Sequence, residues 1–331
     1  MIRTIAIALL GLILGTTGYA QQFKVATLAP DGSNWMDQMR MAAERVEQRT
    51  DGQVSVRFYP GGVMGDSSAV LRRMRLGQLH GGAFTLGDLA DVSAAVNLYS
   101  MPFVFQSLEE IQALREEFDP LVLQGLAEGG LVAPAISLGG FALLFSHREL
   151  PQQAEQVTSA FRIWVPAGDR LSQQTLERAG ATPVPLPLAD VYTALQTGAV
   201  NTFAATPSAA IVLQWHTRVR SVLDMPLLMT AGTVGFDQRA ISRLSDEQAR
   251  ILSEEFAAAL NQIEAQNRAD NQEARAALRK QGIQFVSPAA DAVSGWHDLA
   301  RRIRRQALEA GDVTLPHFER LEQRLATLRG Q

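Results

Sequence analysis

The chain has 331 residues, of which 47% are hydrophobic and 19% are charged, a composition typical of a soluble globular protein with a sizeable core. Its formal net charge of −4 provides no basic surface, so we expect no nucleic acid partner. The sequence contains no cysteine, which excludes disulfides, thiolate metal sites and a cysteine nucleophile.

Residues 1–20 have the pattern of a secretory signal peptide, with Arg3, an apolar run over residues 5–14 and the small-residue cleavage pattern GYA. The apolar run is shorter than the ~20 residues that span a bilayer, although a retained membrane anchor is the alternative. The sequence therefore predicts export to the periplasm.

The first predicted unit after this peptide is a strand over residues 23–30, followed by a helix capped by Asp31 or Ser33. Trp35 lies about 100° from the core-facing stripe of that helix and points toward the loop that precedes it. Ligands of α/β proteins often bind at that end of the sheet, so Trp35 is a candidate ligand contact. The alternative interpretation is that Trp35 is a partly buried aromatic residue of the surface, and the sequence favours neither.

A second strand over residues 54–59 ends at the sequence PGG. We interpret PGG as a backbone turn rather than a phosphate-binding loop, because neither GxxxxGK[ST] nor GxGxxG occurs. A basic helix over residues 70–79 precedes a third strand, which places Phe84 and Thr85 near its end. Both residues are candidate ligand contacts.

The middle of the chain is predicted to hold a helix over residues 108–126 and a long, glycine-interrupted strand over residues 132–145. A strand of this length can pass between two domains. Phe141 lies on it, next to the glycine pair, and is a further candidate ligand contact.

The sequence RIWVP at residues 162–166 alternates as a strand does, with Ile163 and Val165 on one face and Trp164 on the other. If Ile163 and Val165 face the core, Trp164 faces a cleft or solvent. Helices over residues 171–179 and 188–197 follow, then a strand over residues 200–204.

Residues 207–226 are predicted to form one helix, which carries Trp215. The strongest helical signal begins at Ser245, which forms a capping box with Gln248, and it ends near Gly282. A helix of this length spans about 55 Å, more than one small domain. Polar residues near position 270 interrupt its apolar stripe, and the lack of a sustained heptad disfavours the alternative of a solitary coiled coil.

Two stretches carry a resemblance to a known family, RIWVP at residues 162–166 and ATPVPLPLADVYTALQTGAVNT at residues 181–202. They resemble the signature of the DctP-type solute-binding proteins of TRAP (tripartite ATP-independent periplasmic) transporters, and VYTALQTG is the most specific part. The resemblance implies an α/β, periplasmic binding protein-like fold with two α/β domains around a cleft, braced by a long helix at about 245–281. The implied domains are residues 21–143 plus 231–268 for domain I and residues 144–230 plus 269–331 for domain II.

The same resemblance identifies three departures from the family pattern. Where the family has an arginine that grips a substrate carboxylate, this chain has Trp164, and where many members have a second arginine it has Ala142. Thr206 stands where an asparagine often helps to fix the ligand. Burying a carboxylate without a paired cation costs several kcal/mol even after relaxation, so we expect an apolar or amphipathic ligand.

The candidate ligand-binding residues are therefore mainly aromatic, with a few polar groups for a head group. Among the polar ones, Arg170 has the alternative of a helix-surface arginine. The predicted set is Trp35, Phe84, Thr85, Phe141, Trp164, Arg170, Phe203, Thr206 and Trp215.

The resemblance implies a periplasmic solute-binding subunit that delivers a small molecule to the small and large subunits of a TRAP membrane permease. A subgroup with a tryptophan in the strand is associated with a TPR-repeat periplasmic lipoprotein, which is a further candidate partner. The alternatives are a ligand receptor for a sensor or an ATP-driven importer, and an exported hydrolase. Because the sequence has neither HExxH nor GxSxG, we predict no enzyme activity, no cofactor and no metal site.

Overall fold

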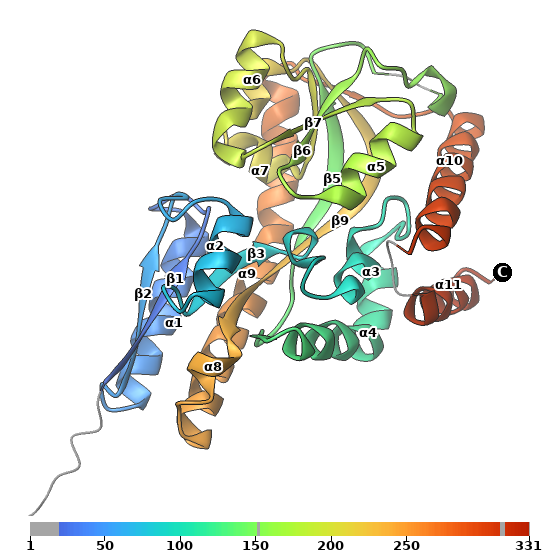
Figure 1. Cartoon of the computed structure of the whole chain (residues 1–331). Helices are drawn as coiled ribbons and strands as arrows, with labels where there is room; N and C mark the ends of the chain where they lie inside the picture. Colours follow the sequence, from blue (N-terminus) through green and yellow to red (C-terminus); the bar gives the residue numbers. More distant parts are fainter. Residues whose placement is uncertain (1–19, 151–152, 312–314, 331) are drawn as a thin grey trace, which may run out of the picture.

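The computed structural model describes residues 20–150, 153–311 and 315–330 of the chain. It shows a ten-stranded sheet with helices packed around it (Figure 1), so the predicted mixed α/β class is confirmed. Of the predicted signal peptide, only Ala20 lies within the described residues. Among the described helices, none is both long enough and apolar enough to cross a membrane.

The first group of strands is parallel, because β1 pairs with both β2 and β3 in the same direction. Helix α1 begins after Ser33, whose hydroxyl oxygen accepts a hydrogen bond from the backbone N–H of Met36, as the capping pattern predicts. The elements of this part are β1 (Gln21–Ala26), α1 (Asn34–Arg49), β2 (Val54–Tyr59), α2 (Ser67–Arg75), β3 (Gly81–Thr85), α3 (Asn97–Ser100), α4 (Leu108–Glu128) and β4 (Leu131–Val132).

The second group contains the segment with the family signature. Strand β6 pairs in parallel with β7 and β8, and β8 pairs antiparallel with β5. The elements of this part are β5 (Ser137–Ser146), β6 (Arg162–Pro166), α5 (Arg170–Arg178), β7 (Thr182–Leu186), α6 (Val191–Thr197), β8 (Thr202–Ala205) and α7 (Pro207–Val212).

Strand β9 (Ser221–Asp237) joins the two groups into one sheet. Its 17 residues extend for about 56 Å at ~3.3 Å per residue. It pairs antiparallel with β3 and β4 through its carboxyl end, and with β5 along most of its length. The chain then continues through α8 (Gln238–Ile241), α9 (Asp246–Lys280), β10 (Gln284–Val286), α10 (Ala290–Glu309) and α11 (Leu315–Leu328).

Two sequence predictions about these strands are wrong. The single helix predicted over residues 207–226 is instead the short α7, a turn in which Gln214 has a φ of 59°, and the start of β9. Pairing with β5 and β10 makes these residues extended, which local helical periodicity cannot show. The strand predicted over residues 132–145 is divided into β4 and β5.

Helix α9 has the length, the N-terminal cap and the polar middle that the sequence predicts. Ser245 and Gln248 form the capping box, and the helix has 35 residues, about 52 Å of length. Its polar middle contacts β5, because the Asn267 side chain donates to the Leu138 carbonyl (3.1 Å) and the Asn271 side chain donates to the Gly139 carbonyl (2.8 Å).

The two ends of α9 are buried in different hydrophobic clusters. Phe256 and Leu260 pack with Phe23 of β1 in one cluster, whereas Leu278 packs with Phe203 and Val222 in another. Helix α9 therefore extends along both groups of strands (Figure 1).

Candidate functional site

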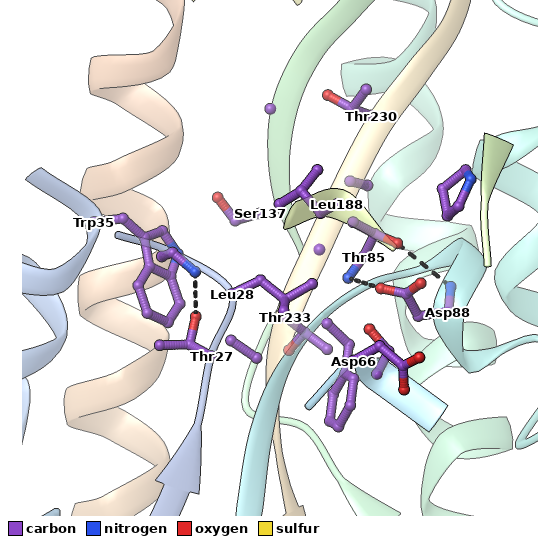
Figure 2. Close-up of a pocket in the computed structure, with 18 of the residues that line it drawn as sticks. Thr27, Leu28, Trp35, Asp66, Thr85, Asp88, Ser137, Leu188, Thr230 and Thr233 are labelled. Atoms are coloured by element: carbon purple, nitrogen blue, oxygen red, sulfur yellow. Dashed lines mark hydrogen bonds between the residues drawn. The ribbon is translucent and has the colours of Figure 1, made fainter. Parts of the chain in front are cut away.

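A cavity of about 350 Å³ lies between the strand ends of the two groups, and we call it the cleft (Figure 2). On one side Leu28 follows β1 and Thr85 ends β3, and on the other side Pro166 ends β6 and Leu188 follows β7. Carboxyl ends of strands are the usual ligand positions in α/β sheets, and the volume lies within the range of small-molecule pockets. The cleft is therefore the candidate ligand site.

Trp164 of β6 forms part of the wall of the cleft. Its side chain lies on the strand face opposite the buried Ile163 and Val165. Its indole Nε1 donates a hydrogen bond to the Leu186 carbonyl at 2.9 Å. Its ring meets that of Trp215 edge to face, with centroids 5.0 Å apart and an interplanar angle of 74°. One hydrogen bond and one aromatic contact thus fix the indole in the wall of the cleft.

Three further predicted residues line the cleft together with Trp164. Trp35 enters from the first turn of α1, on the side of the cleft opposite Asp66 and Asp88 in Figure 2. Phe84 and Thr85 come from the end of β3. Trp35 was predicted from helix periodicity, and Phe84 and Thr85 were predicted from their place near a strand end.

Phe203 and Trp215 do not line the cleft. They are 0% and 2% exposed and lie behind Trp164, where Phe203 contacts Trp215 edge to face and stacks on Phe145 at 5.0 Å. The aromatic residues therefore form a continuous row from the cleft wall into the core, of which only Trp164 reaches the cleft.

Phe141, Arg170 and Thr206 also lie outside the cleft lining. Phe141 of β5 is partly buried and packs against the hydrophobic cluster that contains Leu114 and Phe118 of α4. Arg170 is the exposed first residue of α5. The Thr206 hydroxyl caps α7 by accepting a hydrogen bond from the Ala209 N–H at 3.2 Å, which accounts for a hydroxyl side chain at this position.

Sequence reasoning missed the carboxylates of the cleft. Asp66 lines it while capping α2, and Asp88 lies beside Thr85, whose backbone N–H donates to the Asp88 carboxylate at 3.1 Å (Figure 2). Burial raises the pKa of Asp88, and the nearby carboxylate of Asp169, which caps α5, raises it further. An aspartate before a helix signals a cap, but its place beside a cleft depends on the tertiary fold.

Hydroxyl groups line the back of the cleft. The Thr230 hydroxyl donates to the Gly140 carbonyl (2.8 Å) and the Thr233 hydroxyl donates to the Ala135 carbonyl (2.6 Å). The Ser137 hydroxyl is buried with no hydrogen-bond partner within the described part of the chain. Buried polar groups are normally paired, so the Ser137 hydroxyl is a candidate partner for a ligand atom.

The charge of the cleft differs from that of an anion site. Of the described residues that line it, two are aspartates and none is a lysine, arginine or histidine. Arg162, two residues before Trp164 on β6, donates instead to the Gly198 carbonyl at 2.6 Å. The described residues also contain no group of three or more His, Cys, Asp or Glu side chains that could hold a metal ion.

Comparisons with known proteins agree with this architecture. A profile of the bacterial extracellular solute-binding protein family 7, DctP, matches residues 25–310. A solute-binding protein of Chromohalobacter salexigens is 24% identical over 201 residues, which are 59% of this chain and 59% of that protein. The sialic acid-binding periplasmic protein SiaP of Vibrio cholerae is 27% identical over 207 residues, 60% of this chain and 62% of its own length. The chain thus spans about three fifths of the length of these curated relatives.

A TRAP periplasmic solute-binding protein of Roseobacter denitrificans, solved with bound β-D-glucuronate, superposes with a TM-score of 0.83 at 20% identity, over 92% of this chain and 99% of that one. This likeness shows the fold. The profile match includes the VYTALQTG segment and covers most of the chain. The chain therefore belongs to the bacterial extracellular solute-binding protein family 7, the DctP-type binding proteins of TRAP transporters.

Proposed function

We propose that the chain is the periplasmic solute-binding subunit of a TRAP transporter and that it captures a small organic ligand of apolar or amphipathic character. The observation that carries this proposal is the cleft itself, in which Trp35, Phe84 and Trp164 are accompanied by Asp66 and Asp88 but by no described cation. The proposed site residues are these five together with Thr85 and Ser137.

The charge of the cleft disfavours the acids bound by similar proteins. The Roseobacter denitrificans protein was solved with glucuronate and the Vibrio cholerae protein is named for sialic acid, and both ligands carry a carboxylate. A carboxylate in the present cleft would meet Trp164 where an arginine could stand, and would face Asp66 and Asp88. Burying an unpaired carboxylate costs several kcal/mol, and like charges add to that cost.

Apolar burial can supply the affinity that an ion pair supplies elsewhere. Ten methylene groups transferred from water contribute about 8 kcal/mol at ~0.8 kcal/mol each. A micromolar Kd corresponds to about 8.2 kcal/mol, before the cost of ordering ligand and protein. A ligand with an apolar part of this size therefore suits the cleft.

The proposed mechanism is capture by closure, with no covalent chemistry. Residues 21–143 plus 231–268 form one proposed half, and residues 144–230 plus 269–331 form the other. Strands β5 and β9 and helix α9 connect them. Ligand burial stabilises the closed arrangement, and the small and large permease subunits recognise that arrangement. A TPR-repeat periplasmic lipoprotein stays a predicted further partner on the sequence resemblance alone.

The ligand class is tested by native mass spectrometry of the protein purified from the periplasm, followed by organic extraction and identification of the bound molecule. We expect an apolar or amphipathic compound, and quenching of tryptophan fluorescence when it is added back. Trp164→Ala should weaken this binding at least tenfold, whereas Arg170→Ala, an exposed change outside the cleft, should not. Recovery of only a dicarboxylate or a sugar acid contradicts the proposal.

A further inference from the structure

Three partly exposed carboxylates come together at one end of the cleft. Asp66 and Asp88 line the cleft from the first group of strands, and Asp169 approaches from the second group, at the start of α5. A Cβ atom placed on Gly87 would lie 3.6 Å from Asp169 Oδ2, so the Asp169 carboxylate faces the segment that carries Asp88. The two groups of strands therefore bring like charges toward each other at this end.

The fold supplies no cation for these carboxylates. Each accepts a hydrogen bond from a backbone N–H, at 2.8 Å for Asp66, 3.1 Å for Asp88 and 2.9 Å for Asp169. None of the three forms an ion pair with a basic side chain in the described part of the chain. Burial raises the pKa of Asp88, and the charge of Asp169 raises it further. A cation that enters the cleft beside Asp88 is therefore attracted by a carboxylate that has no other counter-charge.

Aromatic rings form much of the remaining wall. Phe84 and Trp164 line the cleft, and Trp35 lies on the side opposite Asp66 and Asp88 (Figure 2). Aromatic faces attract ammonium groups and also bury alkyl groups. A hard metal ion needs six or more oxygen ligands, and the described residues contain no group of three or more His, Cys, Asp or Glu side chains that could hold one. Acidic and aromatic side chains together thus favour an organic cation.

One further polar group of the cleft is unpaired, independently of the carboxylates. Ser137 lines the cleft from β5 and is 7% exposed, and its hydroxyl has no hydrogen-bond partner among the residues described. Buried hydroxyls are normally paired, so a ligand that brings a polar group into the cleft can complete this one. A hydroxyl oxygen accepts hydrogen bonds from an ammonium N–H as readily as it donates to an acceptor.

We propose that the cleft selects an organic cation, in which an ammonium group pairs with Asp88 and an apolar body lies along Trp35 and Trp164. This rests on the proposed function, and it assigns the polar end of the amphipathic ligand. The ammonium donates charge-assisted hydrogen bonds to the Asp88 carboxylate, and Asp66 and Asp169 add attraction at longer range. A cation beside Asp88 also offsets the repulsion between Asp88 and Asp169, which come from opposite groups of strands, and so favours closure.

The test compares three probes with the same eight-carbon chain by isothermal titration calorimetry at pH 7.5 on the full chain purified from the periplasm. Octan-1-amine is protonated at this pH, as a lysine side chain is, whereas octan-1-ol is neutral and octanoate is an anion. We expect octylammonium to bind at least about tenfold more tightly than octan-1-ol, and octanoate to bind more weakly than either.

Asp88→Asn should remove the preference for octylammonium and leave octan-1-ol binding unchanged. Asp91→Asn is the matched control, because it changes the net charge equally and Asp91 is exposed, three residues further along the chain and outside the cleft lining. Asp169→Asn keeps a side chain that can cap α5, and it should weaken octylammonium binding by less than Asp88→Asn does.

The pH dependence of binding separates direct pairing from a structural effect of the substitution. The affinity for octylammonium should fall as the pH is lowered through the raised pKa of Asp88, with Asp66 and Asp169 as the other titratable groups at this end of the cleft, whereas octan-1-ol binding should not change. Asp88→Asn should reduce this pH dependence without lowering the thermal midpoint of the ligand-free protein.

The inference is overturned if octylammonium does not bind, if octan-1-ol or octanoate binds as tightly, or if Asp88→Asn keeps the preference. The compound extracted from the periplasmic protein distinguishes this inference from the proposed function. An apolar or amphipathic compound without a basic nitrogen overturns the inference and leaves the proposed function standing, whereas a sugar acid contradicts both.

Discussion

Trp164 and Trp215 meet edge to face at 5.0 Å, and this contact links the wall of the cleft to the buried core of the second group of strands. Trp164→Phe keeps the aromatic body but removes the Nε1 hydrogen bond to Leu186, so it should lower the free energy of unfolding by about 1 kcal/mol. Trp164→Ala also removes the packing and should cost about 3 kcal/mol. Urea unfolding measures both, and equal costs would show that the ring contact contributes nothing.

A buried ion pair connects α4 to α9. The Arg115 guanidinium donates to both oxygens of Glu264, at 2.7 and 2.8 Å, and Glu264 also accepts the Leu138 N–H at 2.9 Å. Both side chains are at most 20% exposed. Glu264→Gln removes one carboxylate partner of Arg115 and leaves another, Asp119 (2.8 Å), so it should lower the free energy of unfolding by about 2 kcal/mol.

Glu247→Gln is the control for this change, since it breaks an ion pair with Arg250 that is more than half exposed on both sides. Such exposed pairs contribute little to stability, so the free energy of unfolding measured by chemical denaturation should barely change. An equal effect of the two substitutions contradicts a special role for the pair at Glu264.

Gly140 and Asn271 are predicted to be energetically coupled. Gly140 has a φ of 113°, and a Cβ atom there would lie 2.6 Å from the Asn271 side-chain nitrogen. Gly140→Ala should therefore destabilise the protein through both backbone strain and the clash. Asn271→Ala should cost about 2 kcal/mol, because it leaves the Gly139 carbonyl and the Ser208 N–H without their partner.

A double-mutant cycle measures this coupling by urea unfolding. Because Asn271→Ala removes the clashing nitrogen, the double variant should lose less stability than the sum of the two single losses. Strictly additive losses would mean that backbone strain alone, and not the clash with Asn271, explains the stability cost of replacing Gly140.

Asp88 predicts a pH dependence of stability. Its pKa is raised by burial first and by Asp169 in addition, so the ionised carboxylate is less stable in the folded chain than in the unfolded one. The resulting cost is complete above the raised pKa, shrinks as the pH falls, and is absent below the ordinary value of 3.8. Asp88→Asn should therefore raise the thermal midpoint at pH 7.5, and the gain should shrink toward pH 4. A gain that stays constant across this range rules out ionisation as its cause.

Local sequence patterns correctly predicted the elements that are specified by neighbouring residues, such as helix caps and strand alternation. The Ser245 capping box gave the start of α9, and the alternation of RIWVP placed Trp164 opposite Ile163 and Val165. Strand β9 was not predicted, because its partners are distant in sequence, as in the pairing of Val234 with Ala83. The extended state of these residues comes from that pairing and not from their own propensities.

The residues of the site can likewise be divided into those that local sequence patterns predict and those that only the tertiary fold brings together. Trp35 and Trp164 were found because helix and strand periodicity gives the direction of a side chain. Asp88 and Asp169 were not found, because they are 81 residues apart in the sequence and meet only in the folded chain. Phe203 and Trp215 were predicted as ligand contacts from their chemistry, yet the structure places both behind Trp164 in the core.

The continuous strand β9 also constrains the order in which the chain can fold. The register places Phe84 opposite Thr233, so β3 gains its second neighbour only after residues 232–236 have been synthesised. Contacts of such separation slow folding, because a long loop must close before pairing stabilises the sheet. Neither half can complete its sheet alone, and a fragment that ends before β9 should expose the free edge of β3 and aggregate.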